Sequence, residues 1–479
     1  MPDCPERQGA KTDRHFTRGA ALDNIEALVV AIILALVLRC FLVEAFAIPT
    51  GSMGPTLLGD HYQVGCTQCG YRFAVDKNSP PFSDRDLCPN CGAIANGDPH
   101  RLWGGDRILV NKTLYRFQKP NRWDPFVFIN PTLSSKETEP KSTFIKRLVG
   151  LPSETLEIIR GDVIVNGCIQ RKTPTAQRSL WMLVYDSHWP WSTKPTWEPD
   201  ATPAFWKQEN GLLTVDARQS NRLTFVRFKG HEGDYVIKDQ YGYNAGAGSN
   251  VVTDLRVSLD VTPHGQGSVV LALSEDSGEV SCVIPVAGTQ GSRARVTIGK
   301  EAPEEFDADL PLDKTTRVEF SRLDYRISLK VAGKEVFAKD LWSESLYTSL
   351  VRMGREGKLT PHQTSGVRIG ADHLQADFSW IRIDRDVYYG SGYYLPGITY
   401  GNSEIEHYWG IPGGPFGPTT RDKPDYIGPI RLGPDQYLAL GDNSPKSSDS
   451  RYWGPVPGKN LIGKALVVWW YPTRLRFIH

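Results

Sequence analysis

The chain has 479 residues, with 55 Lys and Arg against 54 Asp and Glu, which gives a formal net charge of +1. This balance excludes a nucleic-acid binder that depends on bulk positive charge, so we expect no nucleic-acid partner. A mean hydropathy of −0.35 excludes a polytopic membrane protein but allows a single membrane anchor. Eight cysteines are too few for a disulfide scaffold of this length.

The first expected elements are a polar segment over 1–24 and an apolar helix over 25–43. The helix would have 19 residues, about the thickness of one bilayer, with Arg39 near its end, where the side chain can reach the headgroups. The basic residues before it predict a cytoplasmic N-terminus and an outer location for the rest of the chain. Two alternatives stay open, namely a signal peptide cleaved at the Ala-Phe-Ala run of 45–47 and a buried helix of a soluble protein.

A Pro- and Gly-rich segment follows, with Ser52 in the run Thr-Gly-Ser-Met-Gly-Pro. A nucleophilic serine needs a base to take its proton, and no His lies nearby. A neutral lysine can serve as that base, and apolar burial favours the neutral form. Lys146 is the candidate, because the residues of 144–149 around it are mostly apolar. A Ser-His-Asp triad stays open, because its members need not be adjacent in sequence, and so does a purely structural loop.

Two more segments are candidates for a functional role. Residues 440–454 are dense in small polar side chains between apolar strands, and therefore predict a loop. This loop is either a hydrogen-bonded turn in which Asp449 pairs with Arg451, or a support for a catalytic group. The other segment begins at Gly105-Asp106.

These four segments follow an apolar N-terminal stretch and occur along the chain in the order typical of one family. They resemble the type I signal peptidases, which are membrane-bound Ser-Lys proteases. The resemblance implies a serine endopeptidase that removes N-terminal signal peptides of the Ala-x-Ala type from exported preproteins, without a cofactor for catalysis. It also implies a location in the cytoplasmic membrane, with the catalytic domain outside. The alternative is a membrane-tethered binding or adhesion protein that keeps a non-catalytic peptidase frame.

The resemblance also implies a role for individual residues. Ser52 matches the nucleophile and Lys146 the general base. Thr50 matches a residue that helps the Ser52 N–H to bind the oxyanion, and Ser447 matches a hydroxyl that hydrogen-bonds the lysine. Ion pairs that brace the site are implied for Asp442, Arg147, Asp449 and Arg451. The resemblance also implies that the shallow pockets for small substrate side chains are lined by Phe46, Ile48 and Ile145.

Four cysteines form two pairs between the first and second motifs. They are Cys66 and Cys69, then Cys88 and Cys91, in the spacing C-x2-C-x18-C-x2-C, which is typical of a zinc site. A glycine after each pair permits a tight turn. Four thiolates suit a closed, structural zinc site. Two disulfides, favoured by an oxidising compartment, and a rubredoxin-like iron site are the alternatives.

A long insertion with short alternating strands separates the catalytic motifs, over about 175–388. The pattern predicts a β-sandwich and resembles laminin-G-like or concanavalin-like jelly rolls, which often bind a carbohydrate or a protein. Since every catalytic motif lies outside it, we expect the insertion to be dispensable for cleavage of a short peptide. The expected strands are 255–261, 268–272, 280–286, 295–298, 317–320, 325–331 and 378–383. The tryptophans expected to pack in a core, with ligand stacking as the alternative, are Trp181, Trp189, Trp191, Trp197 and Trp206.

The sequence therefore predicts a mainly β protein with one N-terminal transmembrane helix and an inserted β-sandwich. The expected parts are a cytoplasmic segment (1–24), a transmembrane helix (25–43), a catalytic domain in three pieces (44–60, 101–174 and 389–479), a zinc-ribbon-like insertion (61–100) and the jelly-roll-like sandwich (175–388).

Overall fold

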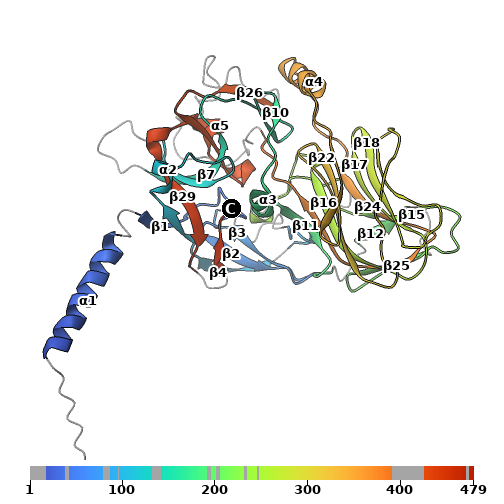
Figure 1. Ribbon diagram of the computed structural model, residues 1–479, viewed down its shortest axis with the longest axis horizontal. Helices are drawn as coiled ribbons and strands as arrows, with labels where there is room; N and C mark the ends of the chain where they lie inside the picture. Colours follow the sequence, from blue (N-terminus) through green and yellow to red (C-terminus); the bar gives the residue numbers. More distant parts are fainter. Residues whose placement is uncertain are drawn as a thin grey trace, which may run out of the picture.

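The computed structural model describes residues 18–37, 42–78, 87–94, 96–131, 142–190, 196–200, 205–230, 235–244, 248–390, 425–470 and 474–479. The chain is mainly β, as the sequence predicts. Figure 1 shows one helix projecting from a body in which several smaller sheets lie beside a large sandwich. Parts of the expected terminal pieces, 1–17 and 391–424, lie outside the described residues.

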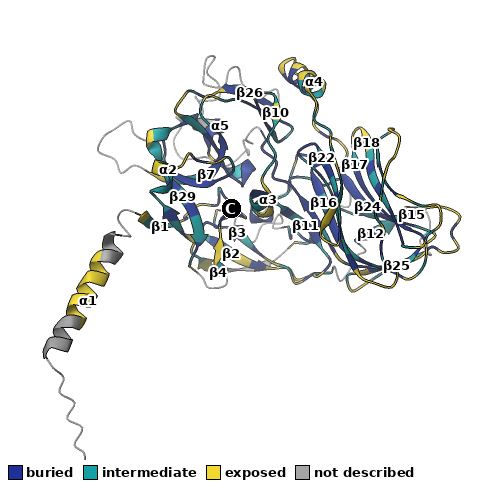
Figure 2. Cartoon of the chain, viewed as in Figure 1, coloured by how far each residue is buried: buried dark blue, intermediate teal, exposed yellow. Residues whose placement is uncertain are grey.

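The projecting helix, α1 (Arg18–Val37), carries exposed apolar side chains between Ile25 and Ile33 (Figure 2). Among the residues that the structure describes, no helix combines the length and the apolar character needed to cross a membrane. The helix expected over 25–43 is wrong at its end, because Val43 already begins strand β1 (Val43–Ala47) and pairs with Asn111. Pairing of an edge strand with a distant partner outweighs the local apolar run at this point.

One eight-stranded sheet combines strands from before and after the insertion. Its order is β1, β5 (Arg107–Asn111), β29 (Leu461–Val468), β6 (Pro125–Ile129), β7 (Thr143–Gly150), β27 (Gln436–Leu440) and β28 (Val456–Pro457), and β30 (Arg476–Phe477) pairs with β29. The neighbours in this sheet are antiparallel. The C-terminal strand β29 therefore lies between β5 and β6, and β27 lies beside β7.

Two smaller sheets flank this one. A four-stranded sheet has the order β10 (Cys168–Ile169), β9 (Asp162–Val165), β8 (Thr155–Ile159) and β26 (Tyr426–Arg431). A three-stranded sheet has the order β3 (Arg72–Asp76), β2 (His61–Gly65) and β4 (Asn96–Trp103). The short helices of the body are α2 (Leu114–Phe117), α3 (Pro174–Leu180), α4 (Glu344–Arg355) and α5 (Ser450–Trp453).

The insertion forms a sandwich of two antiparallel sheets. One has the order β13 (Trp206–Glu209), β14 (Leu212–Asp216), β25 (Gln375–Arg385), β16 (Leu255–Pro263), β21 (Thr316–Leu323), β22 (Arg326–Val331) and β23 (Lys334–Asp340), and β11 (Met182–Asp186) pairs with β25. The other has the order β12 (Trp197–Pro199), β15 (Thr224–Phe228), β24 (Gly366–Asp372), β17 (Ser268–Glu275), β18 (Gly278–Pro285), β19 (Ala294–Ile298) and β20 (Glu304–Phe306).

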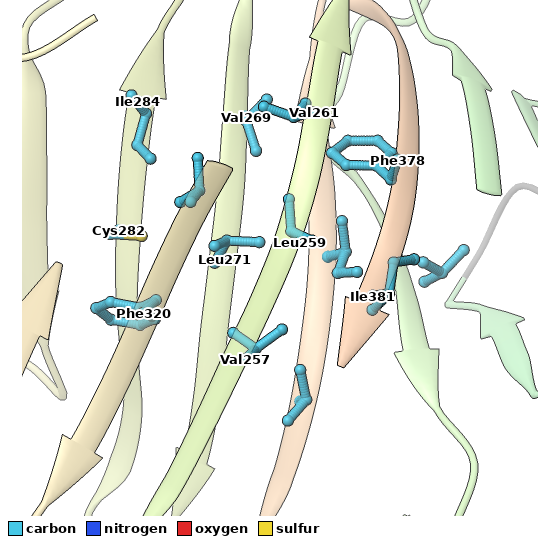
Figure 3. Packing of buried hydrophobic residues seen from close by; sticks show 14 of the residues in the cluster. Val257, Leu259, Val261, Val269, Leu271, Cys282, Ile284, Phe320, Phe378 and Ile381 are labelled. Atoms are coloured by element: carbon cyan, nitrogen blue, oxygen red, sulfur yellow. The ribbon is translucent and has the colours of Figure 1, made fainter. Parts of the chain in front are cut away.

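Side chains from both sheets meet in one core. Figure 3 shows Val257 and Leu259 of β16 close to Leu271 of β17 and Cys282 of β18. This packing follows from the alternation of buried and less buried residues along strands such as β21 and β22. All seven strands expected from the sequence are present, so the prediction of a sandwich is confirmed.

The tryptophans of the insertion serve mainly as packing residues. Trp197 and Trp206 are buried in the sandwich core, as predicted. Trp189 packs against the cysteine cluster, and the guanidinium of Arg256 lies 4.7 Å from the ring centroid of Trp181. The fifth, Trp191, lies outside the described residues.

Candidate active site

The turn after β1 brings Ser52 against Lys146 of β7. The turn is closed by the Gly54 N–H, which donates to the Gly51 carbonyl at 2.9 Å. Lys146 lies opposite Phe126 in the pairing of β6 with β7. The Lys146 Nζ donates a hydrogen bond to the Ser52 Oγ, although 94 residues separate the two in sequence. The structure therefore brings the predicted nucleophile and the predicted base into direct contact.

Burial makes Lys146 a suitable base. Its side chain is 3% exposed, and the Phe144 ring centroid lies 5.8 Å from its Nζ. Desolvation lowers the pKa of Lys146 to about 8, against the opposing effects of the Asp449 and Asp442 carboxylates. A lysine with this pKa is neutral often enough near neutral pH to accept a proton from a serine hydroxyl.

The next residue of β7, Arg147, forms a buried bidentate ion pair with Asp442. The Arg147 Nε and Nη2 donate to the two carboxylate oxygens at 2.7 and 2.6 Å, and both side chains are 0% exposed. The Arg147 Nη1 also donates to the Trp123 carbonyl at 2.7 Å. This pair ties β7 to the loop after β27, and its fork geometry fixes the orientation of both elements.

A second buried ion pair supports the same loop. Arg451 donates through its Nε and Nη2 to Asp449 at 2.9 and 2.7 Å. The Asp449 carboxylate also accepts from the Gly441 N–H at 3.0 Å, and it caps α5 through the Arg451 N–H. The Arg451 Nη2 donates to the Ser444 carbonyl at 2.8 Å. The loop over 441–451 is therefore held by two buried ion pairs, Arg147 with Asp442 and Arg451 with Asp449.

Asn443, which the sequence patterns do not single out, contacts the turn that carries Ser52. Its backbone N–H donates to the Ser52 carbonyl at 3.1 Å, and its Nδ2 donates to the Gly51 carbonyl at 2.9 Å. It is fully buried. The signal that could have found it is its place directly after Asp442 in the polar loop, where a short amide side chain can hold a neighbouring backbone.

The three residues expected to line the substrate pockets lie together. Ile48 is buried in an apolar cluster, and Phe46 and Ile145 pack against it while partly exposed. The close approach that forms this wall needs a glycine at 105, because a Cβ there would lie 1.8 Å from the Ile48 carbonyl oxygen. The Ile48 N–H donates to the Asp106 carbonyl at 2.9 Å. The second motif thus supports the strand that leads to Ser52.

Comparison with known proteins agrees with this geometry. The family model of signal peptidase, peptidase S26, matches residues 96–183 and 414–470. These segments include Lys146, Arg147 and the loop over 441–451, whereas Ser52 lies outside them. We call these two matched segments together the S26 domain, after this similarity. The two matched segments of this S26 domain flank the sandwich.

Curated relatives match the S26 domain over similar lengths. A signal peptidase I of Leptolyngbya laminosa is 30% identical over 148 residues, which are 30% of this chain and 50% of that protein. A probable signal peptidase I-2 of Synechocystis is 30% identical over 161 residues, 34% of this chain and 53% of that protein. The chain therefore spans about half the length of these relatives. A solved carbohydrate-binding module, CBM66 of Bacillus subtilis, is 11% identical with a TM-score of 0.25, covering 40% of this chain and 97% of that one.

Among the described residues, two that were expected to assist the dyad, Thr50 and Ser447, form no hydrogen bond to Ser52 or Lys146. Thr50 is exposed two residues before Ser52, and its help in oxyanion binding stays a prediction. Among the described residues, the buried Ser447 Oγ has no hydrogen-bond partner, so the bond to Lys146 is not formed here. A Cβ on Gly441 would lie 2.1 Å from that Oγ and 2.5 Å from the Ser52 carbonyl oxygen, which places Ser447 close to the turn.

The four cysteines beside the S26 domain form one buried cluster of free thiols. The sulfurs of Cys66 and Cys91 are 3.4 Å apart, and those of Cys69 and Cys88 are 3.7 Å apart. A tetrahedral zinc with bonds of about 2.3 Å places its sulfurs about 3.8 Å from one another. Hydrogen bonds from the Cys88 and Cys91 thiols lower the pKa of Cys69. The cluster thus has the donor set and the size of a four-thiolate metal site.

Proposed function

We propose that this chain is a membrane-bound serine endopeptidase that removes N-terminal signal peptides from exported preproteins. The main support for this proposal is the hydrogen bond from Lys146 to Ser52. Lys146 is buried, and its pKa is lowered to about 8. The S26 domain and the names of the relatives support it.

The mechanism follows from this pair. Neutral Lys146 takes the Ser52 proton while the Oγ attacks the scissile carbonyl, and the acyl-enzyme forms as the mature N-terminus leaves with that proton. Lys146 then takes a proton from water as the water oxygen attacks the ester. The ester C–O bond breaks, and Lys146 gives that proton to the departing Ser52 Oγ, which regenerates both residues. These two residues perform every proton transfer, so the scheme requires no cofactor. The wall of Phe46, Ile48 and Ile145 would accept small residues such as those of an Ala-x-Ala sequence.

We also propose that the apolar run that begins at Ile25 within α1, and continues in the sequence beyond the end of that helix, holds the chain at the cytoplasmic membrane, with the N-terminus in the cytoplasm and the catalytic domain outside. The support is the exposed apolar surface of α1, since large exposed apolar patches of this kind favour contact with a membrane or a partner. Ser52 follows Val43, the first residue of β1, by nine residues, which would place the scissile bond close to the outer membrane face.

For the cysteine cluster, we propose a structural zinc held by Cys66, Cys69, Cys88 and Cys91. Gly70 and Gly92 adopt φ of +75° and +67°, and their N–H groups donate to the carbonyls of Cys66 and Cys88. These are the tight turns that each cysteine pair needs. Bound zinc would cross-link the two turns, a role in stability and not in catalysis.

A second candidate function is binding of a carbohydrate or a protein by the jelly-roll-like sandwich. A hollow of about 410 Å³ at its rim is lined among others by Thr289, Arg293, Phe306, Asp307 and Asp309. An aromatic ring beside charged and hydroxyl groups can take up a polar ligand with an apolar face. Titration of the parent chain and of Phe306→Ala with soluble glucan and mannan oligosaccharides tests this function.

The peptidase proposal is tested with the purified full chain in detergent and a preprotein that carries an Ala-x-Ala site. The parent should cut after that site, and Ser52→Ala should not, while keeping the same thermal unfolding curve. A binding protein on a non-catalytic frame would show no Ser52-dependent cleavage. That result would replace the proposal by the alternative.

A further inference from the structure

A short segment of the insertion reaches the catalytic turn. Tyr241 and the 3-10 helix η3 (Gly242–Asn244), together called the clamp segment, lie between β15 and β16 in sequence. The Tyr243 Oη accepts a hydrogen bond from the Gly59 N–H at 3.1 Å. Its ring fills the space where Gly51 and Gly54 have no side chain, since a Cβ on Gly51 would lie 2.2 Å from the Tyr243 Cε1. Tyr243 is 3% exposed.

The clamp segment also holds the loop that supports Ser52. The Asn244 Nδ2 donates to the Asn443 Oδ1 at 2.6 Å, and the Asn443 Nδ2 donates back to the Asn244 Oδ1 at 2.7 Å. The same Asn443 Nδ2 donates to the Gly51 carbonyl, which fixes the orientation of both amides. The Tyr241 Oη donates to the Asp442 carbonyl at 3.2 Å. The clamp segment therefore contacts both the turn that carries Ser52 and the loop after β27.

We propose that Asn244 and Tyr243 are positioning residues that hold Ser52 in reach of Lys146, so that the inserted domain completes the active site. Asn443 fixes the Gly51 and Ser52 carbonyls, and Asn244 in turn fixes the Asn443 amide. Without Asn244, a buried amide would lose its partner and could turn away from Gly51. Because Gly51 has no side chain, the turn depends on these neighbours for its position.

This inference rests on the proposed function, and it argues against the expectation that the insertion is dispensable for peptide cleavage. The segment lies within 175–388, so replacing that range by a linker would remove the clamp segment together with the sandwich. We therefore expect such a deletion to lose peptide cleavage even where the remaining sheets fold.

Point variants of the full chain test the proposal. In Asn244→Ala we expect kcat to fall about 10- to 100-fold, as for a displaced reacting group, with KM changed less than about twofold. Asn443→Ala should behave alike, and the double variant should be no slower than the slower single variant, because both act through one contact. Asn221→Ala, in an exposed turn of the same sandwich, is the matched control and should keep the parent kcat.

A second readout does not depend on activity. Amide hydrogen exchange of peptides over 51–59 should become faster in Asn244→Ala, and in Tyr243→Phe, where the Gly59 N–H loses its acceptor. Exchange over β16 should stay unchanged. Parent-like kcat in Asn244→Ala, fully additive single variants, or unchanged exchange over 51–59 would each overturn the proposal. A parent chain without Ser52-dependent cleavage would defeat the proposed function, while the exchange result still decides whether the clamp segment holds the turn.

Discussion

Replacing Lys146 by methionine should abolish cleavage and at the same time stabilise the fold. The pKa of this lysine falls from 10.5 to about 8 on burial. At about 1.4 kcal/mol per pKa unit, this lowering corresponds to a penalty on the order of 3 kcal/mol for burying the protonated lysine. Methionine has a similar length, carries no charge and adapts to an irregular site, so Lys146→Met removes this penalty without opening a large cavity.

The difference in the free energy of unfolding between Lys146→Met and the parent depends on pH. The unfolded chain binds a proton at Lys146 more tightly than the folded chain, so the free energy of unfolding of the parent rises as pH increases between about 8 and 10.5. Below about pH 8 the penalty of burying a protonated lysine is fully present, and Lys146→Met should be more stable by up to about 3 kcal/mol. Loss of the hydrogen bond to Ser52 reduces this gain.

Urea unfolding of both proteins in the same detergent, from about pH 6 to pH 10.5, measures the effect. We expect the difference in the free energy of unfolding to be largest at low pH and to shrink toward pH 10.5. Ser52→Ala is a suitable control, since it removes the same hydrogen bond and keeps the lysine. A difference that is independent of pH, or a parent that is more stable than Lys146→Met at pH 6, would refute the reasoning.

Three further predictions concern the catalytic lysine, the buried ion pair beside it and the cysteine cluster. Lys146→Arg should be inactive at every pH because a guanidinium stays protonated, whereas the parent's peptide cleavage rate should rise through about pH 8; a flat parent profile would contradict this. Asp442→Ala should lower the free energy of unfolding in urea by about 3–5 kcal/mol, because Arg147 stays buried without its partner, and a loss below 1 kcal/mol would count against a critical pair. Atomic emission should find about one zinc per chain, absent from Cys66→Ser/Cys88→Ser; mapped disulfides without metal would exclude the site.

Elements with local signals could be predicted from the amino-acid sequence alone. Alternating residues predicted the strands found as β16 and β17, because side chains of a strand point alternately to its two faces. The glycines after the cysteine pairs predicted tight turns, because glycine adopts a positive φ without steric strain. Ser52 and Lys146 could be found because each lies in a short motif whose order along the chain is typical of one family.

Contacts between residues far apart in sequence could be found only from the folded arrangement of the sheets. The end of α1 was predicted wrongly because the pairing of Val43 with Asn111 leaves no trace in the local hydropathy. Asn244 and Asn443 are 199 residues apart, and Tyr243 lies 184 residues from Gly59. No periodicity or motif connects such positions. These contacts form because strands from before and after the insertion pair in one sheet, which brings the sandwich against the turn that carries Ser52. At this turn two glycines leave room for the tyrosine ring.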